Sequence, residues 1–229
     1  MMKTTLGDDH PHTIQAMMNL GYLNSLNEAY DQADQQYTIA LETSRRIRDE
    51  DHPDTIDIIK QVGILSISTK RYSKAKRLLS EALERSRRVF GENHDYTNGI
   101  VLNMGTMYYK QKDYEAALPC FLECLEVARQ QDADRNEYAV IDLSITVGEL
   151  YRLMGRYAEA RPHFIFAIDT HKQLFGTENN GYLIKLENLI SLHTDWHEAD
   201  PTAGHGATAA EYQTELDGIR EWLNDKSKR

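Results

Sequence analysis

Three short segments of the chain place a histidine next to acidic side chains. They read DDHPHT at 8–13, EDHPDT at 50–55 and ENHDYT at 92–97. Histidine beside carboxylates is a pattern of metal ligands and of proton-transfer groups. The same residue types also suit the start of a helix, because its first turn tolerates proline and its positive end favours acids. A single segment does not decide between the two interpretations.

The spacing of the segments favours a helix boundary. A shift of 42 residues superimposes the histidines, and it also superimposes these sets: Gly21, Gly63 and Gly105; Tyr30, Tyr72 and Tyr114; Ala33, Ala75 and Ala117. A fourth copy follows after a shift of 43, and a fifth begins with FGTENN at 175–180. The proline is lost at Asp95 and the histidine at Asn179. Because a linker tolerates such losses more readily than a catalytic centre, we predict linkers between repeated units.

Each period predicts a pair of helices. Apolar residues recur at helical spacing in 13–26, TIQAMMNLGYLNSL, and again in 30–47, YDQADQQYTIALETSRRI. A glycine stands in the middle of each first helix, where it costs about 1 kcal/mol relative to alanine. Because small side chains let two helices approach closely, we expect these glycines to mark the contact with the second helix of the pair.

One copy carries the most complete pattern of large apolar residue, glycine, tyrosine, alanine, aromatic residue and alanine. Its members are Val147, Gly148, Tyr151, Ala160, Phe164 and Ala167. Together with LGDDHPHT at 6–13, this pattern resembles the tetratricopeptide repeat (TPR) in its 42-residue, kinesin-light-chain-like form. The resemblance covers about residues 6–196. It implies an all-α fold, a right-handed superhelix (an α-α solenoid) built from antiparallel helix pairs.

The repeat boundaries predict how the chain is divided. We expect a TPR array over 1–197, with units at about 6–47, 48–89, 90–131 and 132–174 and a half unit at 175–197. A loop over 198–206 should lead to an amphipathic capping helix and tail over 207–229. Residues 1–5 are too short to cap the first unit, so we expect the chain either to be an excised fragment or to begin against another domain.

Composition and charge narrow the classes of partner. The chain has 26 Lys and Arg against 36 Asp and Glu, a net charge of −10, which argues against nucleic acid. No apolar run approaches the roughly 18 residues of a membrane span, and the first residues lack the apolar core of a signal peptide. The two cysteines, Cys120 and Cys124, lie four apart on a predicted helix, where disulfide geometry is rare. We expect a cytoplasmic protein.

The segment HTDWHEADPTAGHG at 193–206 is the strongest candidate for metal chemistry. His193 and His197 are four apart on a predicted helix, as zinc ligands are in some sites. However, His193 falls where other copies carry Tyr108 and Tyr151, which indicates a packing position. The cysteine pair could be redox-active, but Cys124 takes the place of a small packing residue. We therefore expect no catalysis and no cofactor, and a metal site only as a minor alternative.

The resemblance implies that the first helices of the pairs line a concave groove. Two residues before each helix glycine, or at the equivalent place, stand Asn19, Gln61, Asn103, Thr146 and Asn188. A carboxamide both donates and accepts hydrogen bonds, so this ladder suits the backbone of an extended peptide. The alternative is that the amides cap or bridge neighbouring helices.

The other groove candidates mix apolar, aromatic and charged residues. They are Tyr22, Lys60, Ile64, Leu102, Thr106, Tyr109, Lys110, Ile145, Glu149, Arg152 and Lys185. Kinesin light chains, as a family, bind short acidic peptides with an aromatic anchor, and the cations suit such a ligand. The carboxylate clamp of some other relatives has weak support, because only Lys60 stands at the clamp lysine position. We expect an extended peptide with an apolar or aromatic anchor and modest acidity.

Two functional interpretations remain open. In the first, the chain is a non-catalytic scaffold for a protein or peptide partner, within a larger regulatory or transport protein. In the second, it is a structural or self-associating module whose groove is filled by its own tail or by a second copy.

Overall fold

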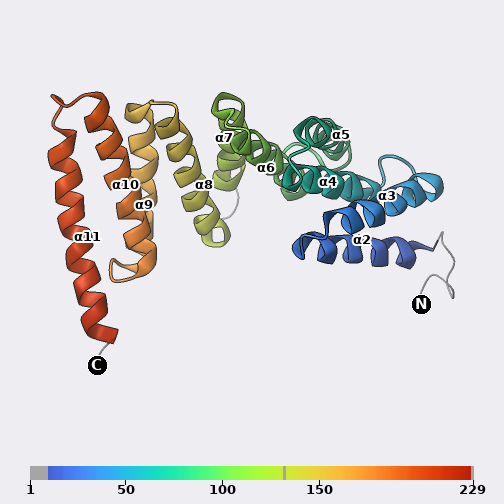
Figure 1. Ribbon diagram of the computed structural model, residues 1–229, viewed down its shortest axis with the longest axis horizontal. Helices are drawn as coiled ribbons and strands as arrows, with labels where there is room; N and C mark the ends of the chain where they lie inside the picture. The colour runs from blue at the N-terminus through green and yellow to red at the C-terminus, as the bar shows by residue number, and fades with distance from the viewer. Residues whose placement is uncertain (1–9, 131–132, 228–229) are drawn as a thin grey trace. The chain divides into compact units, whose positions relative to one another are not determined.

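The computed structural model describes residues 10–130 and 133–227. The described residues form ten helices and no strand (Figure 1), so the predicted all-α fold class is confirmed. The helices are α2 (Pro11–Leu26), α3 (Tyr30–Ile47), α4 (Pro53–Ser68), α5 (Tyr72–Phe90), α6 (Asp95–Lys110), α7 (Tyr114–Gln130), α8 (Ala133–Leu153), α9 (Tyr157–Phe175), α10 (Asn180–Ala199) and α11 (His205–Ser227).

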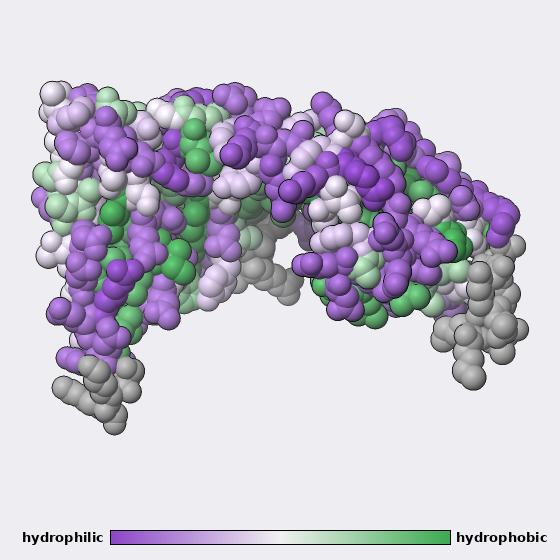
Figure 2. Space-filling model, in the orientation of Figure 1, coloured by the Kyte–Doolittle hydropathy of each residue, from purple (hydrophilic) through white to green (hydrophobic). Residues whose placement is uncertain are grey.

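The helices group into two compact units, Met1–Asp113 and Tyr114–Arg229. Within each unit every helix packs against the next one along the chain, and the first helices of successive pairs also touch: α2 with α4, α4 with α6, and α8 with α10. This sequential packing is the contact pattern of a helical solenoid. In Figure 2 the hydrophobic residues over α8–α11 gather in bands that run along the helices between hydrophilic ridges.

The histidines of the linker segments are helix N-caps. His10, His52 and His94 immediately precede α2, α4 and α6. In each case Nδ1 accepts the backbone N–H two residues further on, at 3.2 Å in α2 and 3.1 Å in α4 and α6. This bond satisfies a backbone donor that the first helical turn leaves unpaired. The linker interpretation of the three segments is therefore confirmed.

Glycines end two of the second helices. Gly91 and Gly176 directly follow α5 and α9, with φ of +95° and +73°. Residues with side chains rarely adopt this conformation, so glycine is the residue that ends these helices there. Gly7, the third glycine at an equivalent place, lies outside the described residues.

A buried polar pair joins successive units. The hydroxyls of Ser44 and Thr55 lie 2.8 Å apart between α3 and α4, and those of Ser86 and Thr97 lie 2.7 Å apart between α5 and α6. Each threonine hydroxyl also lies within hydrogen-bond distance of a linker carbonyl, that of Asp49 or that of Gly91. The two pairs therefore connect the end of one unit, the linker and the start of the next.

The last such junction uses different residues for the same purpose. Between α9 and α10, His171 Nε2 lies 2.8 Å from Asn179 Oδ1. Asn179 also caps α10 by accepting the N–H of Tyr182 at 3.0 Å. The larger imidazole fits because a Cβ on Gly181 would stand 2.5 Å from its Cε1 atom, whereas Tyr96 and Asp54 stand at the equivalent place in earlier units.

The glycines inside the first helices mark close helix contacts, as predicted. A Cβ on Gly21 would lie 2.8 Å from the Tyr37 ring, and one on Gly148 would lie 3.0 Å from the Phe164 ring. Tyr37 and Phe164 are on the second helix of the same pair and are buried. The cost of glycine within a helix is therefore offset by the aromatic ring that packs over it.

The final helix, α11, packs against α10. Leu216 of α11 is buried in the core of the second unit, with Tyr212, Ile219 and Leu223 partly buried around it. The turn before α11 covers only 200–204, shorter than the segment 198–206 expected from the sequence. One reason is visible at Asp200, whose carboxylate accepts hydrogen bonds from the backbone N–H and the hydroxyl of Thr202 and so tightens the turn.

Among the described helices, none combines the length and apolar character that a bilayer crossing requires.

Candidate functional site: the first helices of the repeats

Ten predicted groove residues lie on α2, α4 and α6, in the first unit, and none of them is buried. Tyr22, Leu102 and Tyr109 are the large apolar members that are exposed. Asn19 and Lys110 are also exposed, and the others are partly exposed: Lys60, Gln61, Ile64, Asn103 and Thr106. The first helices of this unit thus present aromatic, apolar, amide and cationic groups to solvent.

Two side chains of the amide ladder, Asn19 and Asn103, form hydrogen bonds within their own helices. Asn19 Oδ1 accepts a hydrogen bond from Gln15 at 3.1 Å. Asn103 Nδ2 donates to the carbonyl of Gly99 at 2.7 Å. A carboxamide has two N–H donors and one carbonyl acceptor, so this bond uses one donor of Asn103. The peptide-binding role of the ladder stays a prediction.

The cation at the clamp position is already engaged. Lys60 Nζ lies 2.6 Å from Asp57 and 4.1 Å from the centre of the Tyr96 ring. The hydroxyl of Tyr96 donates to the same Asp57 carboxylate at 3.0 Å. Burial, followed by the charge of Asp57, raises the pKa of Tyr96 above its ordinary value. Lys60 is therefore held in a local network, which reduces the support for a carboxylate clamp further.

Lys110 is the more accessible cation of the first unit. It lies in the last turn of α6, is exposed, and has no ion-pair partner among the described residues. A surface cation without a local partner keeps its attraction for an incoming carboxylate.

Five predicted residues lie in the second unit, on α8 and α10, and all of them are partly exposed. They are Ile145, Glu149, Arg152, Lys185 and Asn188. Arg152 binds Glu149 at 2.7 Å on its own helix and also binds Asp195 on α10. The hydrogen bond to Glu149 is the main reason that the pKa of Arg152 is raised. Arg152 thus connects two first helices, and its charge is largely matched within the protein.

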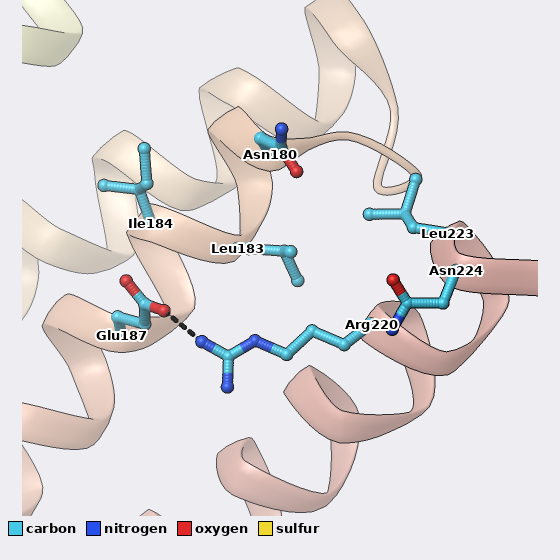
Figure 3. A pocket seen from close by; sticks show the side chains of 7 residues that line it. All are labelled: Asn180, Leu183, Ile184, Glu187, Arg220, Leu223 and Asn224. Carbon is cyan, nitrogen blue, oxygen red and sulfur yellow. Dashed lines mark hydrogen bonds and ion pairs between the residues drawn. The ribbon is translucent and has the colours of Figure 1, made fainter. Parts of the chain in front are cut away.

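A hollow between α10 and α11 was not predicted from the sequence (Figure 3). Its volume is about 440 Å³, and its lining consists of Asn180, Leu183, Ile184, Glu187, Arg220, Leu223 and Asn224. In Figure 3, Arg220 reaches from α11 to Glu187 on α10, and the two form an ion pair. Two leucines and an isoleucine provide the apolar part of the lining. In the sequence, the amphipathic pattern of 207–229 indicated that this helix packs on the array, but it did not indicate a hollow there.

The histidines of 193–206 form an aromatic cluster. His193 is buried, and its Nδ1 lies 3.3 Å from Nδ1 of His205. The His205 ring stacks on Trp196 with centroids 3.8 Å apart. Among the described residues, no group of three or more His, Cys, Asp or Glu side chains is placed to hold a metal ion. The segment therefore joins α10 to α11 by packing, as the position of His193 in the repeat indicated.

Buried His193 and partly buried His163 predict a loss of stability in mild acid. Burial is the main cause that lowers the pKa of His193 and of His163, with nearby His205 and Arg161 adding for His193 and Arg129 for His163. Because the folded state favours the neutral rings, both contribute stability above the unfolded pKa of about 6.5, and this is lost as the pH falls below it. Urea unfolding should give a lower free energy at about pH 5.5 than at about pH 7.5. His193→Gln should reduce this difference; an unchanged difference in the variant would contradict the assignment to His193.

The cysteines are not arranged for thiol chemistry. Both are free, and Cys124 is buried. Burial raises the pKa of Cys120 and raises that of Cys124 to about 12. Because the thiolate is the reactive form, Cys124 stays a protonated packing residue near neutral pH.

Helix pairs, histidine-capped linkers and glycine contacts together define a helical-repeat scaffold. One family model of the tetratricopeptide repeat matches residues 58–130, and a second model of the same repeat matches residues 13–54 and 146–180. The chain belongs to the tetratricopeptide repeat family, whose members are protein–protein interaction scaffolds. No curated protein matches the sequence at a significant level.

Solved structures share the fold at low sequence identity. A kinesin light chain from Podosopora anserina with nearly identical TPR-like repeats has a TM-score of 0.78 and 12% identity, over 92% of this chain and 96% of that one. BtubC (BKLC) from P. vanneervenii has a TM-score of 0.72 and 20% identity, over 93% and 82%. A Rap protein complexed with Competence and Sporulation Factor has a TM-score of 0.57 and 14% identity, over 93% and 65%. At these identities the likeness establishes the fold alone: a TPR solenoid of the kinesin-light-chain-like type.

Proposed function

We propose that this chain is a non-catalytic scaffold that binds an extended segment of a protein partner along its first helices. The observation that carries the proposal is the solvent-facing set on α2, α4 and α6. Exposed aromatic and apolar residues there lie on the same helices as amides and a cation. The Rap protein that shares the fold was solved with a bound factor, which supports a binding role. A scaffold of this kind belongs in a larger regulatory or transport protein.

The exposed groups define the ligand that we propose. Tyr109 and Leu102 on α6 offer apolar surface to an aromatic or apolar anchor. Lys110 follows directly on the same helix and attracts an acidic residue of the ligand. Asn103 offers polar contacts to the backbone. The ligand is therefore an extended peptide with an apolar anchor and modest acidity, and not a strongly acidic one, because the chain's excess of acidic residues opposes it.

A peptide array probed with the full chain tests this proposal. Peptides that bind should share an aromatic or large apolar anchor with one or two neighbouring acids. For such a peptide, fluorescence anisotropy should show the affinity falling about tenfold, equivalent to about 1.4 kcal/mol, in the double variant Asn103→Ala, Lys110→Ala. Lys172→Ala, an exposed lysine at the end of second helix α9, is the matched control and should bind normally. Unchanged binding in the double variant, or an equal loss in the control, would overturn the proposal.

A further inference from the structure

The first helix of the array carries a row of exposed leucines. Leu20, Leu23 and Leu26 of α2 are 47%, 54% and 62% exposed. They are three residues apart, so they lie on one side of the helix. At the positions of Leu20 and Leu23 the later units are covered: Val62 and Leu65 of α4 are 5% and 2% exposed, and Val147 and Leu150 of α8 are fully buried. The same repeat positions are thus buried in α4 and α8 and open in α2.

The repeat architecture explains the difference. The later first helices α4, α8 and α10 each pack against the helix that precedes them and the helix that follows them, as α4 does with α3 and α5. Among the described residues, α2 contacts only α3 and α4 (Figure 1). Leu20 and Leu23 therefore lie on the side that is covered in α4 and α8.

The absence of Asp, Glu, Lys and Arg from α2 also indicates that this side of the helix is covered by a partner. Charged residues make up 27% of the chain, yet the sixteen residues of α2 contain no Asp, Glu, Lys or Arg. By contrast, α4 carries Asp54, Asp57 and Lys60 on a helix of the same length. A surface helix normally has a charged face toward water, whereas a helix that is apolar on two sides is buried. In α2 the second apolar side is formed by Ile14, Met17 and Met18, which face the core.

We propose that two copies of this chain associate through their α2 helices, packed antiparallel about a two-fold axis, with Leu20, Leu23 and Leu26 of each copy in the contact. Each chain has a net charge of −10, so most faces of two copies repel one another. The α2 face brings apolar side chains together without bringing any charged side chain of α2 with it. A two-fold contact is also self-complementary, since the same row of leucines lies on both sides of it.

The other end of the chain does not offer an alternative site for this face. Head-to-tail stacking would need α11 to present an apolar outer side to α2 of the next copy. Other residues of α11, among them Gln213, Asp217 and Glu221, are exposed and polar. These polar residues do not match the leucine row of α2, so head-to-tail stacking of copies is not expected. The three leucines are not among the proposed peptide-binding residues, which on α2 are Asn19 and Tyr22, so each dimer carries two copies of that surface.

Sedimentation equilibrium of the full chain tests the proposal. The mass should rise from 26.4 kDa toward twice that value between about 5 and about 500 µM, because a single helix pair gives a small, weak interface. Leu23→Lys and Leu23→Glu should each stay monomeric over this range. Because Leu23 is exposed, neither variant should change the thermal unfolding midpoint measured at low concentration. Ile184→Lys changes a leucine-like residue of similar exposure on α10 and should dimerise as the unmodified chain does.

Mixing the two charged variants identifies the contact. If Leu23 lies near the two-fold axis, an equimolar mixture of Leu23→Lys and Leu23→Glu should form a dimer again, because opposite charges then face one another. A monomer at every concentration, a dimer that survives Leu23→Lys, a mass beyond two chains, or no recovery on mixing would each overturn the proposal. Peptide binding by the monomeric variants is expected to persist, so failure of this proposal and failure of the proposed function give different results.

Discussion

Replacing Phe164 by alanine is expected to lower the free energy of unfolding by about 3–5 kcal/mol, the range for large-to-small changes of buried aromatics. Phe164 is 2% exposed, at the centre of the second unit's core. Its ring fills the space that Gly148 leaves on α8. Truncation would leave a cavity between two helix backbones whose separation is set by other contacts, so little collapse can compensate. Urea denaturation followed by circular dichroism measures the loss.

Phe166 provides the matched control on the same helix. Its ring is 37% exposed, and the guanidinium of Arg129 lies 5.5 Å from the ring centre. Phe166→Ala removes the same atoms but opens no cavity, so we expect a loss below about 1 kcal/mol. Equal losses in the two variants would show that the ring on Gly148 is not a central packing element.

Two glycine-to-alanine changes are expected to have opposite signs. A Cβ on Gly63 would lie 2.9 Å from both Cγ and Cδ2 of Leu79, a fully buried residue on the paired helix α5. Overpacking of this kind costs about 1–3 kcal/mol, which outweighs the gain of about 1 kcal/mol in helix propensity. A Cβ on Gly99, inside α6, would meet nothing within 4 Å. Gly99→Ala should therefore raise the free energy of unfolding by up to about 1 kcal/mol.

Thermal and urea unfolding of the two variants, side by side, check the signs. The comparison isolates the helix contact, because both changes add one methyl group to the interior of a first helix. Stabilisation by Gly63→Ala would mean that α4 and α5 can separate at little cost.

The fold could be predicted because its determinants are local and repeated. A histidine that caps a helix needs only the backbone two residues ahead of it, so the same short segment gives the same boundary at His10, His52 and His94. Likewise, a glycine in one helix and a large side chain in the next depend on a single helix pair. Repetition at a period of 42 then turned a weak signal in one copy into a firm one.

The candidate site was harder to predict because it depends on contacts between copies. The engagement of Arg152 by Asp195, 43 residues away, occupies a cation that the sequence offered as a ligand contact. Asp195 lies one residue beyond Thr194, the residue equivalent to Arg152 in the next first helix, so a comparison of charges at one repeat position would not have indicated the pair. The network of Lys60, Asp57 and Tyr96 crosses from α4 to α6 and needs the rotation of both helices. That rotation is not set by residue types alone.

The junctions between units limit which units can be exchanged. A unit that ends in Ser44 or Ser86 fits a following unit that begins with Thr55 or Thr97, and duplication of such a unit would reproduce a compatible joint. The unit that ends in His171 requires Gly181 behind its imidazole, and the earlier units offer Asp54 or Tyr96 there. Recombination within this chain is therefore permitted at its early joints and blocked at its last one. A designed array that copies the fourth unit would have to copy the start of the fifth with it.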